Sequence, residues 1–125
     1  MILCDTNILI EFYKNNAVVV SELKKIGTPN IGVSVVTSGE LIFGALNKNE
    51  LAQILKDLAQ LTSFEINGAI CSLFLKLMAK YSLSHNLTLP DAIIAATAIH
   101  HDLPLYTFNL KDFRYIDGLN LHLTS

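Results

Sequence analysis

Short, largely apolar runs recur along the chain, separated by longer segments whose apolar positions repeat at helical spacing. The short runs cover residues 1–4, 31–36, 63–66 and 104–107. They predict strands, because they are too short for helices and suit burial on both faces of a sheet. Residues 119–123 are a candidate fifth strand at the sheet edge.

The longer segments predict helices at 8–13, 18–26, 37–46, 49–61, 67–83 and 91–101. Thr6 and Asn7 offer capping oxygens for the first helix, Asn67 caps the longest, and Pro90 takes a first-turn position of the last. Strands separated by helices predict an α/β fold, with a mainly parallel sheet of four to five strands covered on both faces. The length fits a single domain, residues 1–125.

Composition narrows the class of protein. Hydrophobic residues make up 51% of the chain and the mean hydropathy is +0.43. Buried strands and a subunit interface account for this apolar surplus, since no apolar run approaches the ~18 residues that span a bilayer. The N-terminus lacks a basic segment ahead of an apolar core, so we expect a cytoplasmic protein with no membrane association.

The two cysteines, Cys4 and Cys71, lie in apolar segments and are expected to be buried, reduced thiols. Neither a Cys-x-x-Cys nor a His-x-His spacing occurs, which argues against a zinc site.

Four acidic residues stand at the ends of otherwise apolar segments: Asp5, Glu40, Asp91 and Asp112. Asp5 directly follows the first predicted strand, Glu40 lies in the first turn after the second, and Asp112 comes shortly after the fourth. Since ligands bind outside the carboxyl ends of parallel strands, these three are expected at one edge of the sheet. Asp91 differs, because it opens a helix that no strand directly precedes.

Carboxylates gathered in this way need a counter-charge, and oxygen-only ligands suit magnesium or manganese. The net charge of -2 does not indicate a nucleic-acid binder. Without the four acids, however, the remaining acidic residues are fewer than the nine Lys and Arg. A polyanionic substrate is therefore permitted once a cation occupies the pocket.

Each acid also has a structural interpretation. Thr37-x-x-Glu40 and Thr88-x-x-Asp91 both fit the capping box at a helix start. Asp5 is harder to explain in this way, because an acid directly after a buried strand needs a partner. The fourth acid lies in a polar turn, where an aspartate is ordinary.

Other polar residues carry weaker signals. His100 and His101 end a helix, where the helix dipole favours an imidazolium, and His85 and His122 have no partner visible in the sequence. No glycine-rich phosphate loop is present. The tyrosines are too dispersed to predict a stacking platform: Tyr13, Tyr81, Tyr106 and Tyr115. Lys111 and Arg114 flank Asp112 and could meet phosphates, although solvation is the ordinary state of such residues.

Taken in order, these motifs resemble the PIN domain family, and more narrowly its VapC-type toxins from bacterial toxin–antitoxin pairs. The matching segments span essentially the whole chain: residues 5–10, Thr37-x-x-Glu40-Leu41 with Gly44-Ala45, residues 91–98, residues 107–113 and Gly118-Leu119. Each motif is weak alone, whereas four in the right order and spacing are specific.

The resemblance implies a three-layer α/β/α fold and a magnesium- or manganese-dependent ribonuclease. Asp5, Glu40 and Asp91 match the family's acidic core, and Asp112 matches its fourth acid. Asn109, a neighbouring polar residue, is a second candidate for that fourth position of the site. Thr6 and Thr107 match supporting hydroxyls. The resemblance also implies a homodimer and a cognate antitoxin that blocks the active site.

We therefore expect an endoribonuclease toxin that uses one or two metal ions, with Asp5 and Asp91 binding the principal ion and Glu40 and Asp112 completing the site through water or a second ion. Transfer RNA is a candidate substrate, and messenger and ribosomal RNA stay open. The alternative is a catalytically inactive PIN-like module that acts by binding protein or RNA. An aspartyl-phosphate enzyme fits less well, because position 7, where such enzymes carry a second Asp, is Asn7.

Overall fold

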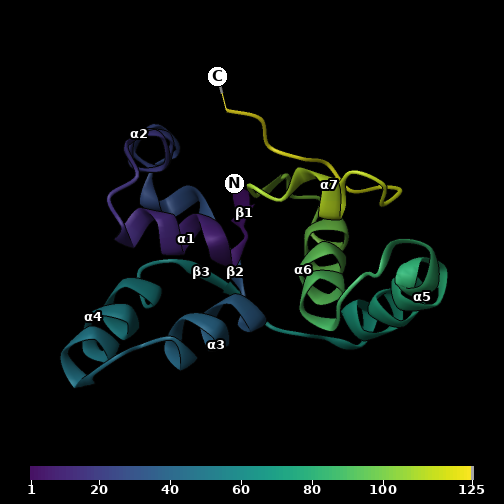
Figure 1. Ribbon diagram of the computed structural model, residues 1–125, viewed down its shortest axis with the longest axis horizontal. Coiled ribbons are helices and arrows are strands. Elements are labelled where there is room, and N and C mark those ends of the chain that lie inside the picture. Colours follow the sequence, from purple (N-terminus) through teal and green to yellow (C-terminus); the bar gives the residue numbers. More distant parts are fainter. Residues whose placement is uncertain (125) are drawn as a thin grey trace.

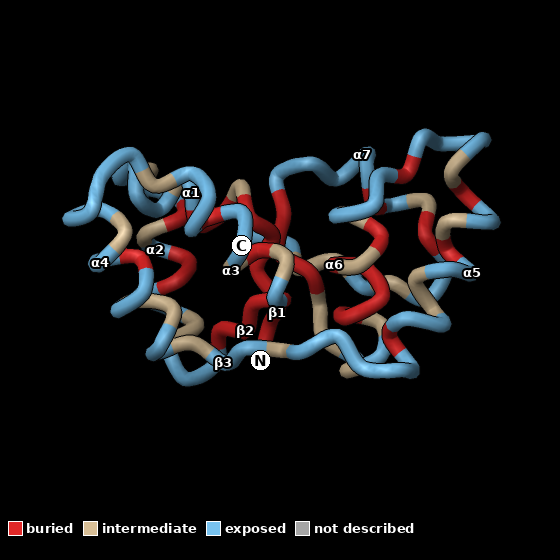
Figure 2. Tube along the Cα trace, turned by 90° about the horizontal axis from the view of Figure 1, so that it is seen from below, coloured by how far each residue is buried: buried red, intermediate tan, exposed pale blue. Residues whose placement is uncertain are grey.

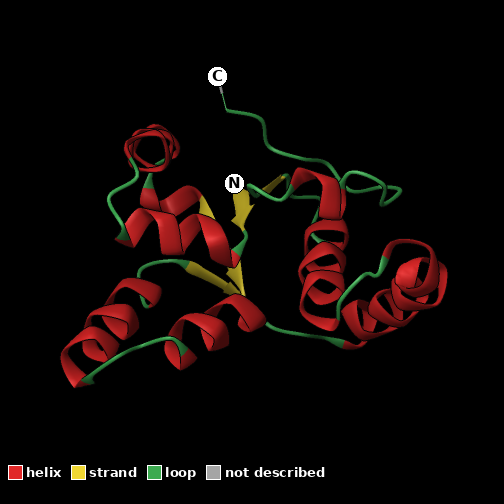
Figure 3. Cartoon of the chain, in the orientation of Figure 1, coloured by secondary structure: helices red, strands yellow, loops and turns green. Residues whose placement is uncertain are grey.

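A parallel four-stranded sheet lies at the centre of the computed structural model, which describes residues 1–124. Its strands are β1 (Ile2–Cys4), β2 (Ile31–Ser34), β3 (Thr62–Phe64) and β4 (Leu105–Tyr106). They are arranged in the order β3-β2-β1-β4, and every neighbouring pair is parallel. Figure 3 shows the strands between two groups of helices. The first strand of the chain therefore occupies an inner position, between β2 and β4.

Helices cover both faces of the sheet (Figure 1). One group comprises α1 (Thr6–Tyr13), α2 (Ala17–Ile26), α3 (Val35–Phe43) and α4 (Lys48–Leu58), and the short 3-10 turn η1 (Thr28–Asn30) follows α2. The other comprises α5 (Gly68–His85) and α6 (Leu89–His100), followed near the C-terminus by the single-turn α7 (Leu110–Phe113). This arrangement confirms the predicted α/β fold with three layers.

The sheet separates two hydrophobic cores, because successive side chains of a strand point to opposite faces. In β1, Leu3 packs into the core beneath α5 and α6. Ile2 and Cys4 pack into the core beneath α1 to α4. Figure 2 shows this burial concentrated in the middle of the molecule, around β1, β2 and α6. The inner strands are thus apolar on both faces, which explains their short apolar runs.

Several sequence-based boundaries differ from the structure. The predicted fifth strand is reduced to a single parallel bridge between Leu105 and Leu121. The helix expected from residue 37 begins at Val35, because Ser34 caps it by accepting a hydrogen bond from the Thr37 amide at 3.3 Å. It ends at Phe43, before the expected residue 46.

Two side-chain environments also differ from expectation. Cys4 is buried, which raises the pKa of its thiol to about 12, but Cys71 is exposed on α5. His122 does have a partner, because its Nε2 lies 3.0 Å from Oε1 of the largely buried Glu22.

Within residues 1–124, no helix is long and apolar enough to cross a bilayer.

Gly32, in the inner strand β2, is required by the close approach of an aromatic ring. A Cβ at this position would lie 2.4 Å from Cε2 and 3.2 Å from Cδ2 of Phe64. That ring has little freedom to move, since it packs on the core and lies 4.5 Å from the His101 ring. We expect Gly32→Ala to lower the free energy of unfolding by about 1–3 kcal/mol, as overpacking does.

Gly39→Ala is the matched control, because Gly39 lies within α3 and a Cβ there meets no atom within 4 Å. It should raise the free energy of unfolding by about 0.5–1 kcal/mol, since alanine favours helix interiors over glycine. Denaturant unfolding of the two variants measures both effects. Equal stability of the two variants would contradict the packing argument.

Candidate active site

Asp5 is a buried carboxylate at the carboxyl end of β1. Its side chain is 5% exposed and caps α1, with Oδ1 accepting a hydrogen bond from the Thr6 amide at 2.8 Å. Oδ2 accepts a hydrogen bond from the Thr107 hydroxyl at 2.8 Å. Burial raises the pKa of Asp5 above its ordinary value; these two hydrogen bonds oppose the shift, and the charges of Glu40 and Asp112 add to it. The site therefore disfavours the charge of Asp5 unless a cation is present.

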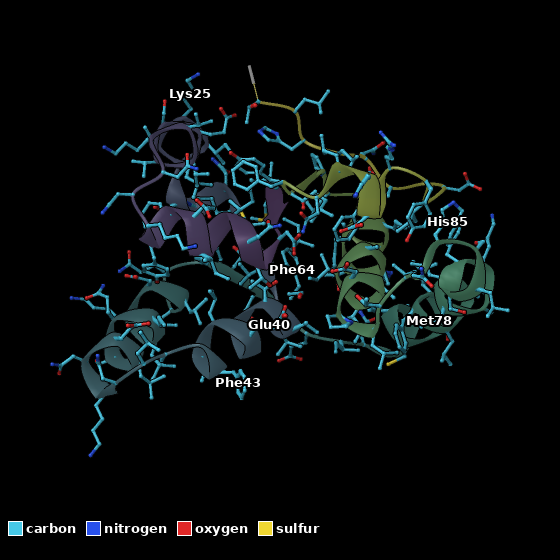
Figure 4. The ribbon with its side chains drawn as sticks, in the orientation of Figure 1. Lys25, Glu40, Phe43, Phe64, Met78 and His85 are labelled. Carbon is cyan, nitrogen blue, oxygen red and sulfur yellow. The ribbon has the colours of Figure 1, made fainter. Side chains whose placement is uncertain are left out.

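Glu40 is connected to Asp5 through the first residue of α1. The Thr6 hydroxyl lies 2.8 Å from Glu40 Oε1 and 3.1 Å from the Thr37 hydroxyl. A carboxylate only accepts, so Thr6 donates to Glu40 and accepts from Thr37. This chain of hydroxyls holds an otherwise exposed carboxylate beside the end of β1, and it leaves Glu40 Oε2 free of this contact. Figure 4 shows Glu40 near the centre of the molecule.

Asp91 lies in the first turn of α6, which Thr88 caps through its hydroxyl, 3.4 Å from the Asp91 amide. Burial raises the pKa of Asp91 to about 6, with further contributions from the charges of Asp5, Asp112 and Glu40. A hydrogen bond to Thr88 opposes the shift. The charges that act on Asp91 are thus those of the other three predicted acids, although no strand precedes its helix.

Asp112 lies on α7, exposed to solvent, and its charge acts on both Asp5 and Asp91. Asn109, the neighbouring candidate, precedes α7 and contributes its backbone: its amide donates to the Thr107 hydroxyl at 3.0 Å, and its carbonyl accepts from the Asp112 amide at 2.9 Å. The Asn109 side chain makes no capping hydrogen bond to α7. Of these two residues, Asp112 carries the charge that reaches the other acids.

The fold thus places Asp5 and Asp91 within electrostatic reach of each other and of both Glu40 and Asp112. Within residues 1–124, however, no three His, Cys, Asp or Glu side chains lie close enough together to hold a metal ion as they stand. The donor chemistry fits magnesium or manganese, because every group offers carboxylate oxygens and Asp5 retains a free lone pair on each oxygen. Metal binding would therefore require these side chains to move closer together than they lie in this structure.

The structure also separates the functional and the structural interpretations of these motifs. The capping box expected at Thr37 and Glu40 is wrong, since Ser34 caps α3 and Thr37 is fully buried beside Thr6. The cap at Thr88 is confirmed. Sequence reasoning missed the contact of Thr37 with Thr6, although Thr37 and Glu40 are three residues apart and share a helix face.

A groove of about 620 Å³ opens beside Glu40, along α1, α3 and α4. Its lining is mixed, with apolar side chains such as Ile10, Leu41 and Leu46 alongside Lys14 and Glu50. Leu46 and the neighbouring Phe43, which Figure 4 shows beyond α3, are 86% and 92% exposed. An apolar surface of this kind, next to a catalytic carboxylate candidate, is typical of an interaction site.

Comparison with family models gives a match to the PIN domain over residues 2–119. The chain belongs to the PIN domain family. Comparison with the curated proteins finds no match.

Solved structures of the same fold come from toxin–antitoxin systems. A chain of a toxin–antitoxin complex from Klebsiella pneumoniae is 32% identical, with 95% of each chain covered and a TM-score of 0.81. A chain of VapBC-1 from nontypeable Haemophilus influenzae is 27% identical, with 98% of this chain and 97% of that chain covered and a TM-score of 0.77. A chain of DNA-bound VapBC from Salmonella typhimurium is 23% identical over 98% of both chains, with a TM-score of 0.85.

Proposed function

We infer that this PIN domain protein is a metal-dependent endoribonuclease and the toxin of a type II toxin–antitoxin pair. The observation that carries the proposal is the placement of four acids around the end of β1: burial raises the pKa values of Asp5 and Asp91, and the charges of their acidic neighbours add to both shifts. Strongly perturbed carboxylates are typical of functional sites. The likeness to chains from toxin–antitoxin complexes supports the biological role.

The acids would share the work of phosphodiester hydrolysis. Asp5 and Asp91 would hold the principal divalent ion, with Glu40 and Asp112 completing the site through water or a second ion. A divalent ion bound there supplies a Lewis acid for the phosphoryl oxygen and a lowered pKa for bound water. Thr6 and Thr107 orient the carboxylates of Glu40 and Asp5 through their hydroxyls.

Glu40 and Asp91 are the carboxylates proposed for proton transfer during hydrolysis. Glu40 Oε1 is held by Thr6, so Oε2 is available to accept a proton from an attacking water. The pKa of Asp91, raised to about 6, brings its titration close to neutral pH in the metal-free protein. Bound cations favour the charged form, so the metal-loaded site would keep Asp91 ionised.

The proposed partners are an antitoxin and a second copy of the chain. An apolar segment of the antitoxin would lie in the groove along α1, α3 and α4, where Ile10, Leu41 and Leu46 offer contacts and Glu40 also lines the wall. Occupation of that groove would block access to the site. Exposed apolar residues on α1 and α2, such as Phe12 and Val18, suit a homodimer surface.

RNA cleavage by the purified protein tests the proposal. We expect labelled single-stranded RNA to be cut in the presence of Mg²⁺ or Mn²⁺, cutting to stop on addition of EDTA, and activity to return with excess metal. The cognate antitoxin, added to the same reaction, should also stop it. Cleavage that persists in EDTA would refute the metal-dependent mechanism, and absence of cleavage under every metal would favour the alternative of an inactive binding module.

A further inference from the structure

Three aromatic side chains that are dispersed in the sequence gather beside the acidic site. The His85 ring stacks on Tyr115, with centroids 4.0 Å apart and an angle of 12° between the planes. Tyr81 meets Tyr115 edge-on at 5.0 Å and His85 edge-on at 5.7 Å. The tyrosines are too dispersed in the sequence to predict a stacking platform, but packing brings two of them, Tyr81 and Tyr115, into contact.

The outer face of the exposed His85 ring has no aromatic neighbour among residues 1–124. The three centroid distances place Tyr81 beside the stack, on the Tyr115 side of the His85 ring, so neither tyrosine covers its other face. His85 is exposed at the end of α5, as Figure 4 shows, next to the loop that follows α7. A flat ring with one supported face and one open face can accept another ring on the open side.

The base of the stack is held in place from several sides. Tyr81 is 6% exposed, and its hydroxyl accepts a hydrogen bond from the Asp117 amide at 3.2 Å. Ser84 Oγ lies 2.7 Å from Nδ1 of His85. The supporting ring, Tyr115, packs on the core. The rings are therefore ordered before any ligand arrives, which lowers the entropic cost of binding.

The stack is next to the acids along both chain segments that form it. His85 ends α5, and the short connection 86–88 leads directly to the helix that carries Asp91. Tyr115 follows α7, which carries Asp112. Burial raises the pKa of Tyr115, and the charges of Asp91 and Asp112 add to the shift, so its phenol lies within reach of their fields.

Basic side chains accompany the stack. Lys111 and Arg114 lie on and directly after α7, are exposed, and form no ion pair within residues 1–124. Arg114 is the single arginine of the chain, and a guanidinium is suited to bidentate contact with phosphate. A stacking surface, cationic groups and acidic residues thus lie on two neighbouring segments of the chain, and these are groups that a single polynucleotide strand can contact.

We propose that the His85–Tyr115 stack binds a nucleobase of single-stranded RNA next to the scissile phosphate, with Arg114 and Lys111 contacting the intervening backbone. This inference rests on the proposed ribonuclease function. It adds a base-binding position outside the acidic site and the residue, His85, that would form it. A base of any identity satisfies the contact, because every base has a stacking face.

The test is equilibrium binding of labelled ribo-oligonucleotides to protein carrying Asp5→Asn, which prevents cleavage, in Mg²⁺. The probes are an octamer of adenylate and an abasic octamer with the same backbone. We expect His85→Ala to weaken binding of the adenylate octamer about fivefold to a hundredfold, as loss of one stacked base does, and to leave the abasic octamer unaffected. His85→Trp should retain affinity, and its fluorescence should be quenched by adenylate, since the chain has no other tryptophan.

His100→Ala is the matched control, because His100 is exposed at the other end of α6 from Asp91 and the change removes the same ring. It should not alter binding of either octamer. Thermal unfolding of both variants separates a loss of contact from a loss of fold.

The outcomes distinguish this inference from the proposed function. If His85→Ala weakens binding of both octamers equally, or of neither, while the unmodified protein cleaves RNA, base binding by the His85–Tyr115 stack is refuted and the ribonuclease function stands. If binding depends on the bases and on His85 but the unmodified protein cuts no RNA, base binding stands and the ribonuclease function is refuted. Failure of the adenylate octamer to bind refutes base binding, and an antitoxin side chain is then the remaining candidate ligand of the His85 ring.

Discussion

Asp5→Asn is expected to lower the rate of RNA cleavage at least about a hundredfold while leaving the fold intact. Asp5 is the acid most deeply placed in the site, and loss of one preorganised charge-stabilising group commonly costs 10²–10³ in rate. The amide keeps the shape of the side chain and still accepts from the Thr6 amide through its oxygen. Initial rates on labelled RNA and thermal unfolding measure the two halves of the prediction.

Asp102→Asn is the control for this substitution. Asp102 is exposed just beyond the C-terminal end of α6, away from the acids, and its φ of 53° is a conformation that asparagine tolerates. Activity of this variant should equal that of the unmodified chain. An Asp5→Asn protein that folds and cuts RNA at an undiminished rate would refute the proposed site.

The same cleavage assay tests whether Asp112 or Asn109 is the fourth residue of the acidic site. Asp112→Asn should lower the rate by less than Asp5→Asn, because Asp112 is exposed to solvent whereas Asp5 is buried at the end of β1. Asn109→Ala should have the smaller effect of the two, since its observed hydrogen bonds come from the backbone. A larger loss in Asn109→Ala would assign that position to Asn109 instead.

The second large effect concerns the stability of the metal-free protein, which the substitution Asp91→Asn should increase. In metal-free protein at pH 7.5, we expect Asp91→Asn to raise the melting temperature by a few degrees, because it removes a charge that the site disfavours. After a discount for solvent screening, the raised pKa corresponds to about 1–2 kcal/mol. Saturating Mg²⁺ or Mn²⁺ should reverse the order, since the ion stabilises the site that binds it.

The dependence on pH follows from linkage. The pKa of Asp91 is raised from 3.8 to about 6 on folding, so the folded state binds more protons than the unfolded state between these values. The contribution of the Asp91 carboxyl to the stability of the metal-free protein is fully present below pH 3.8, and it is lost as the pH rises through 6. The gain from Asp91→Asn should therefore be clearly smaller at pH 4.5 than at pH 7.5, and it should vanish only below pH 3.8, where the carboxyl is protonated in both the folded and the unfolded states.

Asp117→Asn provides a control of opposite sign. The hydrogen bond and charge of Lys80 lower the pKa of Asp117, so its ionised form is favoured in the folded protein. This variant should gain nothing at pH 7.5. A melting temperature of Asp91→Asn that is lower than that of the unmodified chain at both pH values would show that the Asp91 charge is compensated without a metal.

Local signals were sufficient for the elements that position the site. The short apolar run ending at Cys4 predicted a buried strand, and the proline at position 90 predicted the start of the helix that carries Asp91. Boundaries shifted where two caps competed: both Ser34 and Thr37 can cap a helix, and the buried Ser34 takes the role. Residues 119–123 form only one bridge and no strand. An edge strand depends on pairing with its neighbour, which its own sequence does not specify.

The sequence by itself determined the fold class, the order of the acids along the sheet and the family to which the chain belongs, because periodicity and motif spacing are local properties. The tertiary structure decided which hydroxyl holds Glu40, 34 residues away from it, and how far burial and neighbouring charge raise the pKa of Asp91. It also brought Tyr115 onto His85 and Tyr81. These features arise from packing between distant segments, and neither desolvation nor the proximity of charges can be read from positions along a chain.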